Sequence, residues 1–284
     1  MKDRVYPPVI GLARVVFRLL GLRWNVVGAE HIPRTGGAVL ASNHVSYLDF
    51  TICGFAAQPS RRLVRFLAKD VVFKNRFVGP LMRGMHHIPV DRSAGAQAFA
   101  DAVRALQAGE VVGVFPEATI SQSFMLKSFK LGVARMAMEA SVPIVPMVTW
   151  GGQRILTKGG RYSLRRRRTI MVTVGQPIRP EQADRAGSLT LRLHTRMSEL
   201  LADTQARYRD PPDRPGDLWW LPAQLGGTAP TPAEAAVLDG RVARDRTAAA
   251  VTPSDSVQSA PGVCSPTEPD SRPEEKPVDP DPAG

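Results

Sequence analysis

Residues 38–49 read AVLASNHVSYLD, and this stretch indicates the fold class more clearly than any other part of the chain. The run from Ala38 to Ser42 is short and apolar, as expected of a buried strand. Polar residues follow it, and helical spacing begins at Tyr47. The stretch therefore predicts a strand that leads directly into a helix, which is the repeating unit of α/β domains.

The same alternation of strands and helices continues along the chain. Short apolar runs predict further buried strands at Leu63–Leu67, His87–Val90, Val111–Phe115, Ile144–Thr149 and Thr169–Val174. Helical spacing is found at Tyr47–Ala57, Ala96–Ala108, Lys130–Ala140 and Ser188–Arg207. We therefore predict an α/β domain with a central, mostly parallel sheet flanked by helices.

An apolar segment from Pro8 to Leu22 precedes this domain and is compatible with a helix. It contains Arg14 and Arg18 and is shorter than the ~20 residues that a membrane-spanning helix needs. Its apolar residues share one face, which suits a helix lying in the plane of lipid headgroups, but a helix packed on the domain has the same periodicity. No small-residue cleavage site follows, so we do not expect a secretory signal. We assign residues 1–24 to this membrane-associating helix.

The composition changes near Pro222. Residues 223–284 contain ten prolines, no aromatic residue, and ten acidic against five basic residues. Such a segment buries too little apolar surface to offset the entropy lost on ordering. We therefore predict a folded domain over residues 25–222 and a disordered, Pro-rich acidic tail over 223–284, with at most a short helical patch around Pro232–Leu238.

The whole chain has a net charge of +11, and residues 1–222 alone carry +16. Such a basic domain is expected to bind an anionic partner. Arg161 and Arg165–Arg168 form a dense basic patch, which we interpret as attracted to an anionic membrane or to coenzyme A phosphates, although a solvated loop also fits. The two cysteines, Cys53 and Cys264, provide neither a disulfide framework nor a metal-ligand set, which is typical of a reducing compartment.

Chemically useful side chains follow three of the predicted strands directly. His44 and Asp49 follow the first, Arg92 follows the strand ending at residue 90, and Glu117 and Thr119 follow the strand ending at residue 115. The carboxyl ends of parallel strands share one edge of a sheet, and α/β folds bind their ligands at that edge. We therefore expect a base, a guanidinium and a carboxylate to converge there.

His44 and Asp49 can pair only if a helix begins between them, because residues five apart on a regular helix are rotated by about 140°. Ser46 followed by Asp49 matches a capping box, which places His44 in the non-helical lead-in. If paired, Asp49 would fix the imidazole tautomer and His44 would act as a general base toward a hydroxyl. The alternative is that Asp49 only caps the helix and His44 has no catalytic role.

Four ordered blocks carry a family resemblance: residues 43–49 (NHVSYLD), 88–92 (IPVDR), 115–119 (FPEAT) and 142–146 (VPIVP). In order and spacing they resemble the four blocks of the glycerolipid acyltransferases, most closely the 1-acylglycerol-3-phosphate (lysophosphatidate) acyltransferase, or PlsC-like, family. The resemblance extends from Asn25 to Gln176. Motifs of serine hydrolases, nucleotide-binding loops and zinc proteases are not found in the sequence.

The resemblance implies that a fatty acyl group passes from a thioester, acyl-CoA or acyl carrier protein (acyl-ACP), to the hydroxyl of lysophosphatidate, giving phosphatidic acid for phospholipid biosynthesis. His44 would take the hydroxyl proton and Asp49 would orient the imidazole, with no acyl-enzyme. Arg92 would bind the acceptor's phosphate, because a guanidinium forks onto phosphate oxygens. Glu117 and Thr119 would hold the acceptor's polar backbone. The thioester is a co-substrate, and neither a metal nor a further cofactor is implied.

The third block departs from the family pattern. Many relatives read FPEGTRS where this chain reads FPEATIS, so Ile120 stands where an arginine is expected. Lys127 and Lys130 follow closely and could supply a replacement cation. Lysophosphatidate is the leading acceptor, and another lysophospholipid or a glycolipid hydroxyl is the alternative.

Two other classes of protein fit parts of the pattern. A basic nucleic-acid-binding protein would need aromatic residues for stacking, and Tyr162 is the only one within the arginine patch. A membrane-binding relative without activity is disfavoured by His44 and Asp49. We thus expect an enzyme held peripherally or monotopically at the cytoplasmic face of the cell membrane, with no nucleic acid as partner.

Overall fold

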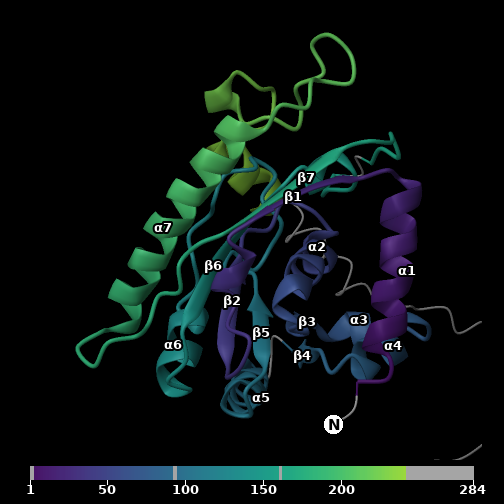
Figure 1. The fold of residues 1–284 in the computed structure, drawn as a ribbon. Coiled ribbons are helices and arrows are strands. Elements are labelled where there is room, and N and C mark those ends of the chain that lie inside the picture. Colours follow the sequence, from purple (N-terminus) through teal and green to yellow (C-terminus); the bar gives the residue numbers. More distant parts are fainter. Residues whose placement is uncertain (1–2, 92–94, 160–161, 241–284) are drawn as a thin grey trace, which may run out of the picture. The chain divides into compact units, whose positions relative to one another are not determined.

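The computed structural model describes residues 3–91, 95–159 and 162–240. Within them, seven strands form one sheet in the order β1-β7-β6-β2-β5-β3-β4 (Figure 1). The strands are β1 (Arg23–Val27), β2 (Ala38–Ser42), β3 (Val64–Lys69), β4 (Ile88–Val90), β5 (Val111–Val114), β6 (Ile144–Trp150) and β7 (Thr169–Val174). All neighbouring strands pair in parallel except β6 and β7, which are antiparallel. The predicted α/β class with a mostly parallel sheet is confirmed.

One strand, β1, was not expected from the sequence. Its residues alternate between exposed and half-buried positions, so it lacks the apolar run that predicts a buried strand. Its partner is β7, with Arg23 opposite Thr169. An edge strand of this kind is specified by its distant partner more than by its own composition.

The helices lie over both faces of the sheet. They are α1 (Tyr6–Leu19), α2 (Asp49–Ala56), α3 (Asp70–Lys74), α4 (Val78–Gly84), α5 (Gly95–Gln107), α6 (Gly132–Glu139) and α7 (Ala186–Arg207). The four helices predicted within the domain correspond to α2, α5, α6 and α7. The short α3 and α4 were not predicted, because neither is long enough to show a helical period.

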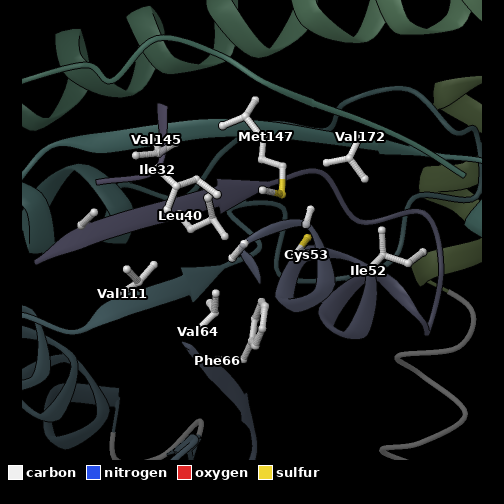
Figure 2. Close-up of a cluster of buried hydrophobic side chains, with 14 of the residues drawn as sticks. Ile32, Leu40, Ile52, Cys53, Val64, Phe66, Val111, Val145, Met147 and Val172 are labelled. Atoms are coloured by element: carbon white, nitrogen blue, oxygen red, sulfur yellow. The ribbon is translucent and has the colours of Figure 1, made fainter. Parts of the chain in front are cut away.

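Side chains alternate between the two faces of β2 and separate two hydrophobic clusters. Leu40 faces the cluster that includes Ile52 and Cys53 of α2, which is drawn in Figure 2. Val39 faces the opposite cluster, which includes buried side chains of α5, α6 and α7. Both faces of β2 are therefore covered, which explains why its sequence is a continuous apolar run.

Helix α1 packs on the domain along one side only. The Tyr6 hydroxyl donates a 2.8 Å hydrogen bond to the Val64 carbonyl, and Phe17 lies against Trp24 and Phe55. Other apolar side chains of this helix stay in solvent, with 66% of Leu12 and 68% of Leu19 exposed. The helix thus combines a packed face with an exposed apolar one. Among the described residues, no helix has the length and apolar character needed to cross a bilayer.

The folded chain extends past the boundary that was predicted at residue 222. Residues 232–240 are helical, Ala229 and Ala235 are buried, and Asp239 forms ion pairs with Lys127 and Lys158. The average composition of residues 223–284 does not indicate this folded segment, because its contacts with the domain involve only a few small apolar side chains and one carboxylate. The rest of the predicted tail, residues 241–284 with Cys264, lies outside the described residues.

Candidate active site

The site is built where β2, β5 and β6 end. Ala41 is opposite Val114 in β5, and Ser42 is opposite Met147 in β6. The residues that follow these pairs therefore lie side by side, and they include His44, Phe115 and Thr149. The predicted convergence at the carboxyl edge of the sheet has its physical cause in this register.

His44 and Asp49 are hydrogen-bonded to each other. His44 lies in the loop after β2, Asp49 is the first residue of α2, and His44 Nδ1 is 3.0 Å from Asp49 Oδ2. The prediction that Ser46 caps the helix is wrong, because the residue before α2 is Leu48: the Ser46 N–H donates to Asp49 Oδ2 at 2.7 Å, and its hydroxyl accepts the N–H of Leu48. Asp49 thus serves both the helix start and the imidazole, so capping and pairing are not alternatives here.

The surroundings of Asp49 define which nitrogen of His44 carries the proton. Asp49 is fully buried, and its Oδ2 already accepts the backbone N–H groups of Val45 and Ser46, each at 2.7 Å. An oxygen that accepts two N–H donors is an acceptor toward His44 as well, so the proton lies on Nδ1. Nε2 is then the unprotonated nitrogen, and 20% of the His44 side chain is exposed to solvent. This is the tautomer that a general base requires.

A second layer of hydrogen bonds holds the pair from β6. Thr149 Oγ1 donates to Asp49 Oδ1 at 2.9 Å, and the Thr149 N–H donates to Asn43 Oδ1 at 2.7 Å. The Asn43 amide returns a hydrogen bond to the Thr149 carbonyl at 3.1 Å. Thr149 was placed in a predicted strand with no role, because nothing local to it indicates a partner so far away in the sequence.

The imidazole of His44 is stacked on an aromatic ring. The centroids of His44 and Phe115 are 4.2 Å apart at an interplanar angle of 16°, and Phe66 stacks beyond Phe115 at 5.9 Å. Together with the Asp49 hydrogen bond, this contact restricts rotation of the imidazole. Phe115 was quoted within the third block, but only the structure shows that its ring supports His44.

Glu117 accepts hydrogen bonds from two backbone N–H groups at this site, and its contact with an acceptor stays a prediction. Its Oε1 accepts the N–H of His44 at 3.0 Å and its Oε2 accepts the N–H of Lys127 at 3.1 Å. The residue is 5% exposed, and burial raises the pKa of its carboxyl to about 8, although both hydrogen bonds act in the opposite direction. Glu117 thus joins the loop that carries His44 to the segment that follows the third block.

The turn after Glu117 brings further polar groups to the same place. Ala118 has a φ of 61°, a left-handed conformation that glycine adopts more readily, and its N–H donates to the Phe115 carbonyl at 3.0 Å. Thr119 Oγ1 accepts a hydrogen bond from Lys127 Nζ at 2.9 Å. Ile120 is buried at 5% exposure and therefore presents no cation, but its carbonyl accepts from Lys127 Nζ at 3.1 Å. Lys127 Nζ thus lies beside the backbone of the position where the resemblance leads one to expect an arginine.

The remaining predicted ligands are placed less closely. Arg92 falls outside the described residues, two positions after β4 ends. Lys130 is exposed, and its N–H donates to the Pro116 carbonyl at 3.0 Å. Among the residues that the structure describes, no group of His, Cys, Asp or Glu side chains is arranged to hold a metal ion.

The arginine patch is partly structural. Asp213 forms ion pairs with Arg154, Arg165 and Arg168, and Arg168 is only 4% exposed. Arg168 therefore faces the protein interior, contrary to the interpretation of the whole patch as a lipid or coenzyme A contact. Arg166 and Arg167 remain exposed, and Arg161 lies outside the described residues.

Comparisons with known proteins agree with this fold and site. A family model described as Acyltransferase matches residues 23–150. The chain is 27% identical over 194 residues to the 1-acyl-sn-glycerol-3-phosphate acyltransferase of Bacillus subtilis, covering 64% of this chain and 91% of that protein. It is 31% identical over 159 residues to the enzyme of the same name from Limnanthes douglasii, of which it spans 54%. The chain thus spans about half the length of this plant relative.

A solved structure shows the same architecture. The 1-acyl-sn-glycerophosphate acyltransferase PlsC from Thermotoga maritima superimposes with a TM-score of 0.61 at 21% identity, covering 72% of this chain and 81% of the other. Fold, hydrogen-bonded His44 and Asp49, and sequence similarity all agree on one class of enzyme, the acyltransferases. Over residues 23–150 the chain is similar to the PlsC-like acyltransferases.

Proposed function

We propose that this protein transfers a fatty acyl group from acyl-CoA or acyl-ACP to the free hydroxyl of lysophosphatidate, giving phosphatidate for phospholipid synthesis. The observation that carries the proposal is the 3.0 Å contact between His44 Nδ1 and Asp49 Oδ2, which leaves Nε2 free to accept a proton. Relatives named as 1-acyl-sn-glycerol-3-phosphate acyltransferases support the choice of acceptor.

The reaction needs one base and no covalent enzyme intermediate. His44 Nε2 takes the proton of the acceptor hydroxyl as its oxygen attacks the thioester carbonyl carbon. The carbon–sulfur bond then breaks, and the departing sulfur takes the proton from the imidazolium. The products are an ester and a free thiol, and His44 returns to its starting tautomer.

Asp49 acts by stabilising the imidazolium that forms during this step. Its carboxylate is buried and accepts hydrogen bonds from Val45, Ser46 and Thr149, so it is already oriented before the reaction. A preoriented charge in a buried site stabilises a developing cation more than a solvated one does. Phe115 keeps the imidazole plane aligned during the transfer.

Cations near the site support an anionic acceptor. Lys127 contacts Thr119 and lies beside the turn that follows Glu117. Lys130 is exposed to solvent three residues further along the chain. We include Arg92, Lys130 and Thr119 among the acceptor-binding residues on the basis of the family blocks, and Glu117 as a residue that positions the two loops.

The exposed apolar side chains of α1 favour a location at a membrane surface, where lipid substrates are found. Leu12, Val15, Val16 and Leu19 are all more than 40% exposed, and Arg14 and Arg18 accompany them. Apolar side chains with flanking cations bind the headgroup region of an anionic leaflet. We place the protein peripherally on the cytoplasmic face of the cell membrane.

One observation favours a different acceptor within the same chemistry. The side chain of Ile120 is buried, so the phosphate contact expected from an arginine at this position is missing. A lysophospholipid with another headgroup, or a glycolipid hydroxyl, would need that contact less. The acyl transfer step is unchanged in this alternative.

The test is the release of free thiol from acyl-CoA by the purified protein in detergent. Lysophosphatidate, lysophosphatidylinositol and lysophosphatidylglycerol are supplied separately, and His44→Ala serves as the control for background hydrolysis. We expect release that depends on lysophosphatidate and disappears in the control. Release with another acceptor alone supports the alternative, and equal release by His44→Ala removes His44 from the mechanism.

A further inference from the structure

The helix at residues 232–240 places a carboxylate between two lysines beside the candidate active site. Asp239 Oδ2 accepts a hydrogen bond from Lys127 Nζ at 2.5 Å, and Asp239 Oδ1 is paired with Lys158 Nζ. The Gln122 amide also donates to Asp239 Oδ1 at 3.3 Å. The two lysines are 31 positions apart in the sequence, so only the tertiary structure brings their charges together.

Hydrogen bonds connect the segments that carry both lysines to the loop that carries His44. The N–H of Lys127 donates to Glu117 Oε2, and the other oxygen of Glu117 accepts the N–H of His44. Thr157, which precedes Lys158, donates its hydroxyl proton to the Val45 carbonyl at 2.6 Å. These hydrogen bonds therefore fix the segments that carry the two ammonium groups relative to the candidate base.

The donors around Asp239 match a phosphate better than a carboxylate. Three side chains, Lys127, Lys158 and Gln122, donate to the two oxygens of this carboxylate, whereas a phosphate monoester has three terminal oxygens and a higher charge. The side chains of Lys127, Lys158 and Asp239 are only 18–25% exposed, so water screens their charges incompletely. The two ammonium groups share a single anion.

Asp239 supplies that anion within the same chain. Burial alone would raise the pKa of its carboxyl, but the hydrogen bonds and charges of Lys127 and Lys158 outweigh burial and hold that pKa below its usual range. The described part of the helix that carries it comprises residues 232–240 and is anchored through Ala235. Releasing the contact requires this helix to move and leaves the pairing of the strands unchanged.

We propose that Lys127 and Lys158 form a binding site for the phosphate of the acceptor lipid, and that Asp239 occupies this site as a tethered competitor. The inference rests on the proposed function for the identity of the lipid. An incoming phosphate displaces the carboxylate. The helix that carries Asp239 therefore lowers the affinity for the acceptor until the carboxylate leaves the two lysines. The site replaces the cation that Ile120 does not provide.

The experiment measures binding without turnover, so that it does not depend on acyl transfer. Isothermal titration calorimetry gives the dissociation constants of sn-glycerol 3-phosphate, inorganic phosphate and coenzyme A for the full chain. Asp239→Asn removes the competing charge, and we expect it to bind sn-glycerol 3-phosphate about tenfold more tightly than the wild type does. Adding Lys127→Met and Lys158→Met to Asp239→Asn is expected to abolish that gain.

Glu234→Gln is the matched control, because it removes one negative charge from the same helix. Glu234 contacts Thr231 at the start of this helix, and a glutamine oxygen can still accept from it. We expect an unchanged dissociation constant for this variant. Lys158→Met alone serves if the variant with all three substitutions does not fold, and it is expected to weaken the binding of sn-glycerol 3-phosphate.

The outcomes separate this inference from the proposed function. Equal affinities of the wild type and Asp239→Asn, or equal gains in Asp239→Asn and Glu234→Gln, overturn it. A gain for coenzyme A without a gain for sn-glycerol 3-phosphate also overturns it, because the site then belongs to the donor. Inorganic phosphate binding as tightly as sn-glycerol 3-phosphate shows a site for free phosphate and overturns the lipid assignment. If no acceptor supports thiol release but Asp239→Asn still tightens binding, the proposed function fails and the phosphate site remains.

Discussion

Thr149 Oγ1 donates a 2.9 Å hydrogen bond to Asp49 Oδ1, joining two residues that are 100 positions apart. Both residues are completely buried. Through this contact, strand β6 orients the carboxylate that in turn orients His44. The orientation of the candidate base thus depends on a strand that contributes no group to the reaction itself.

Replacing Thr149 with valine preserves the shape of the side chain and removes the hydroxyl. Asp49 Oδ1 then loses a donor in a buried site, so we expect about 1–2 kcal/mol less stability. We also expect kcat to fall by about tenfold with little change in KM, because the imidazolium is held less well. Thermal unfolding and steady-state thiol release give the two quantities.

Thr173→Val is the matched control for that substitution. The Thr173 hydroxyl is 2.7 Å from the Thr204 hydroxyl, in a buried contact between β7 and α7. This variant is expected to lose similar stability and to keep its kcat. Equal losses of kcat in both variants would show that Thr149 acts through stability alone.

His44 and Asp49 are expected to behave as one unit in a double-mutant cycle. His44→Ala and Asp49→Asn should each lower kcat by about 10³-fold, within the range of general base catalysis. In Asp49→Asn, the amide oxygen keeps the place that accepts the Val45 and Ser46 N–H groups, and the imidazolium loses the negative charge that stabilises it. We expect the double variant to be no slower than the slower single variant. Multiplicative losses would contradict a shared role.

Glu117 makes the stability of the protein depend on pH. Its pKa is about 8 in the folded protein, above the usual 4.5, so the folded state holds this proton more tightly than the unfolded state does. The corresponding stabilisation is complete below about pH 4.5 and is lost as the pH rises through 8. Glu117→Gln cannot titrate, so its unfolding free energy should fall less than that of the wild type between pH 6 and pH 9. Chemical denaturation at several pH values measures this difference, and parallel curves would refute it.

The exposed face of α1 is expected to drive binding to lipid vesicles. Replacing Leu12 and Leu19 with serine removes two apolar side chains that are 66% and 68% exposed. Because a buried leucine contributes about 1.5–3 kcal/mol, partial insertion of both predicts at least about a tenfold loss of partitioning. Sedimentation with vesicles containing anionic lipid measures it. Leu191→Ser on α7, where Leu191 is 67% exposed, is the control and should bind as the wild type does.

Much of the fold was predictable because its information is local. The apolar runs of β2, β5 and β6 and the periodicity of α5, α6 and α7 were read within a few residues of their observed bounds. The elements that were missed have weak local signals: β1 is a half-exposed edge strand, and α3 and α4 are one or two turns long. Their stability comes from neighbours that are distant in sequence.

The site divides in the same way. The spacing of His44 and Asp49 left pairing and simple helix capping as alternatives, and the family blocks implied the pair, whose two residues lie within a single loop and helix start. The hydrogen bonds of Glu117 to two backbone N–H groups were not expected, because these two donors become neighbours only when the loops after β2 and β5 meet. The role of Arg168 was misjudged because its partner, Asp213, is 45 positions away.

The sequence by itself determined which chemical groups are present and, within a residue or so, where β2, β5 and β6 end, since both depend on neighbouring residues along the chain. It was sufficient to identify His44, Asp49 and the acyltransferase blocks. Only the tertiary structure decided which groups touch, because the order β6-β2-β5 brings Thr149, His44 and Glu117 to one edge of the sheet. The same holds for Asp239, which lies 112 residues from Lys127 in sequence and 2.5 Å from it in space. Contacts of this kind follow from packing and pairing between distant segments, which no local pattern specifies.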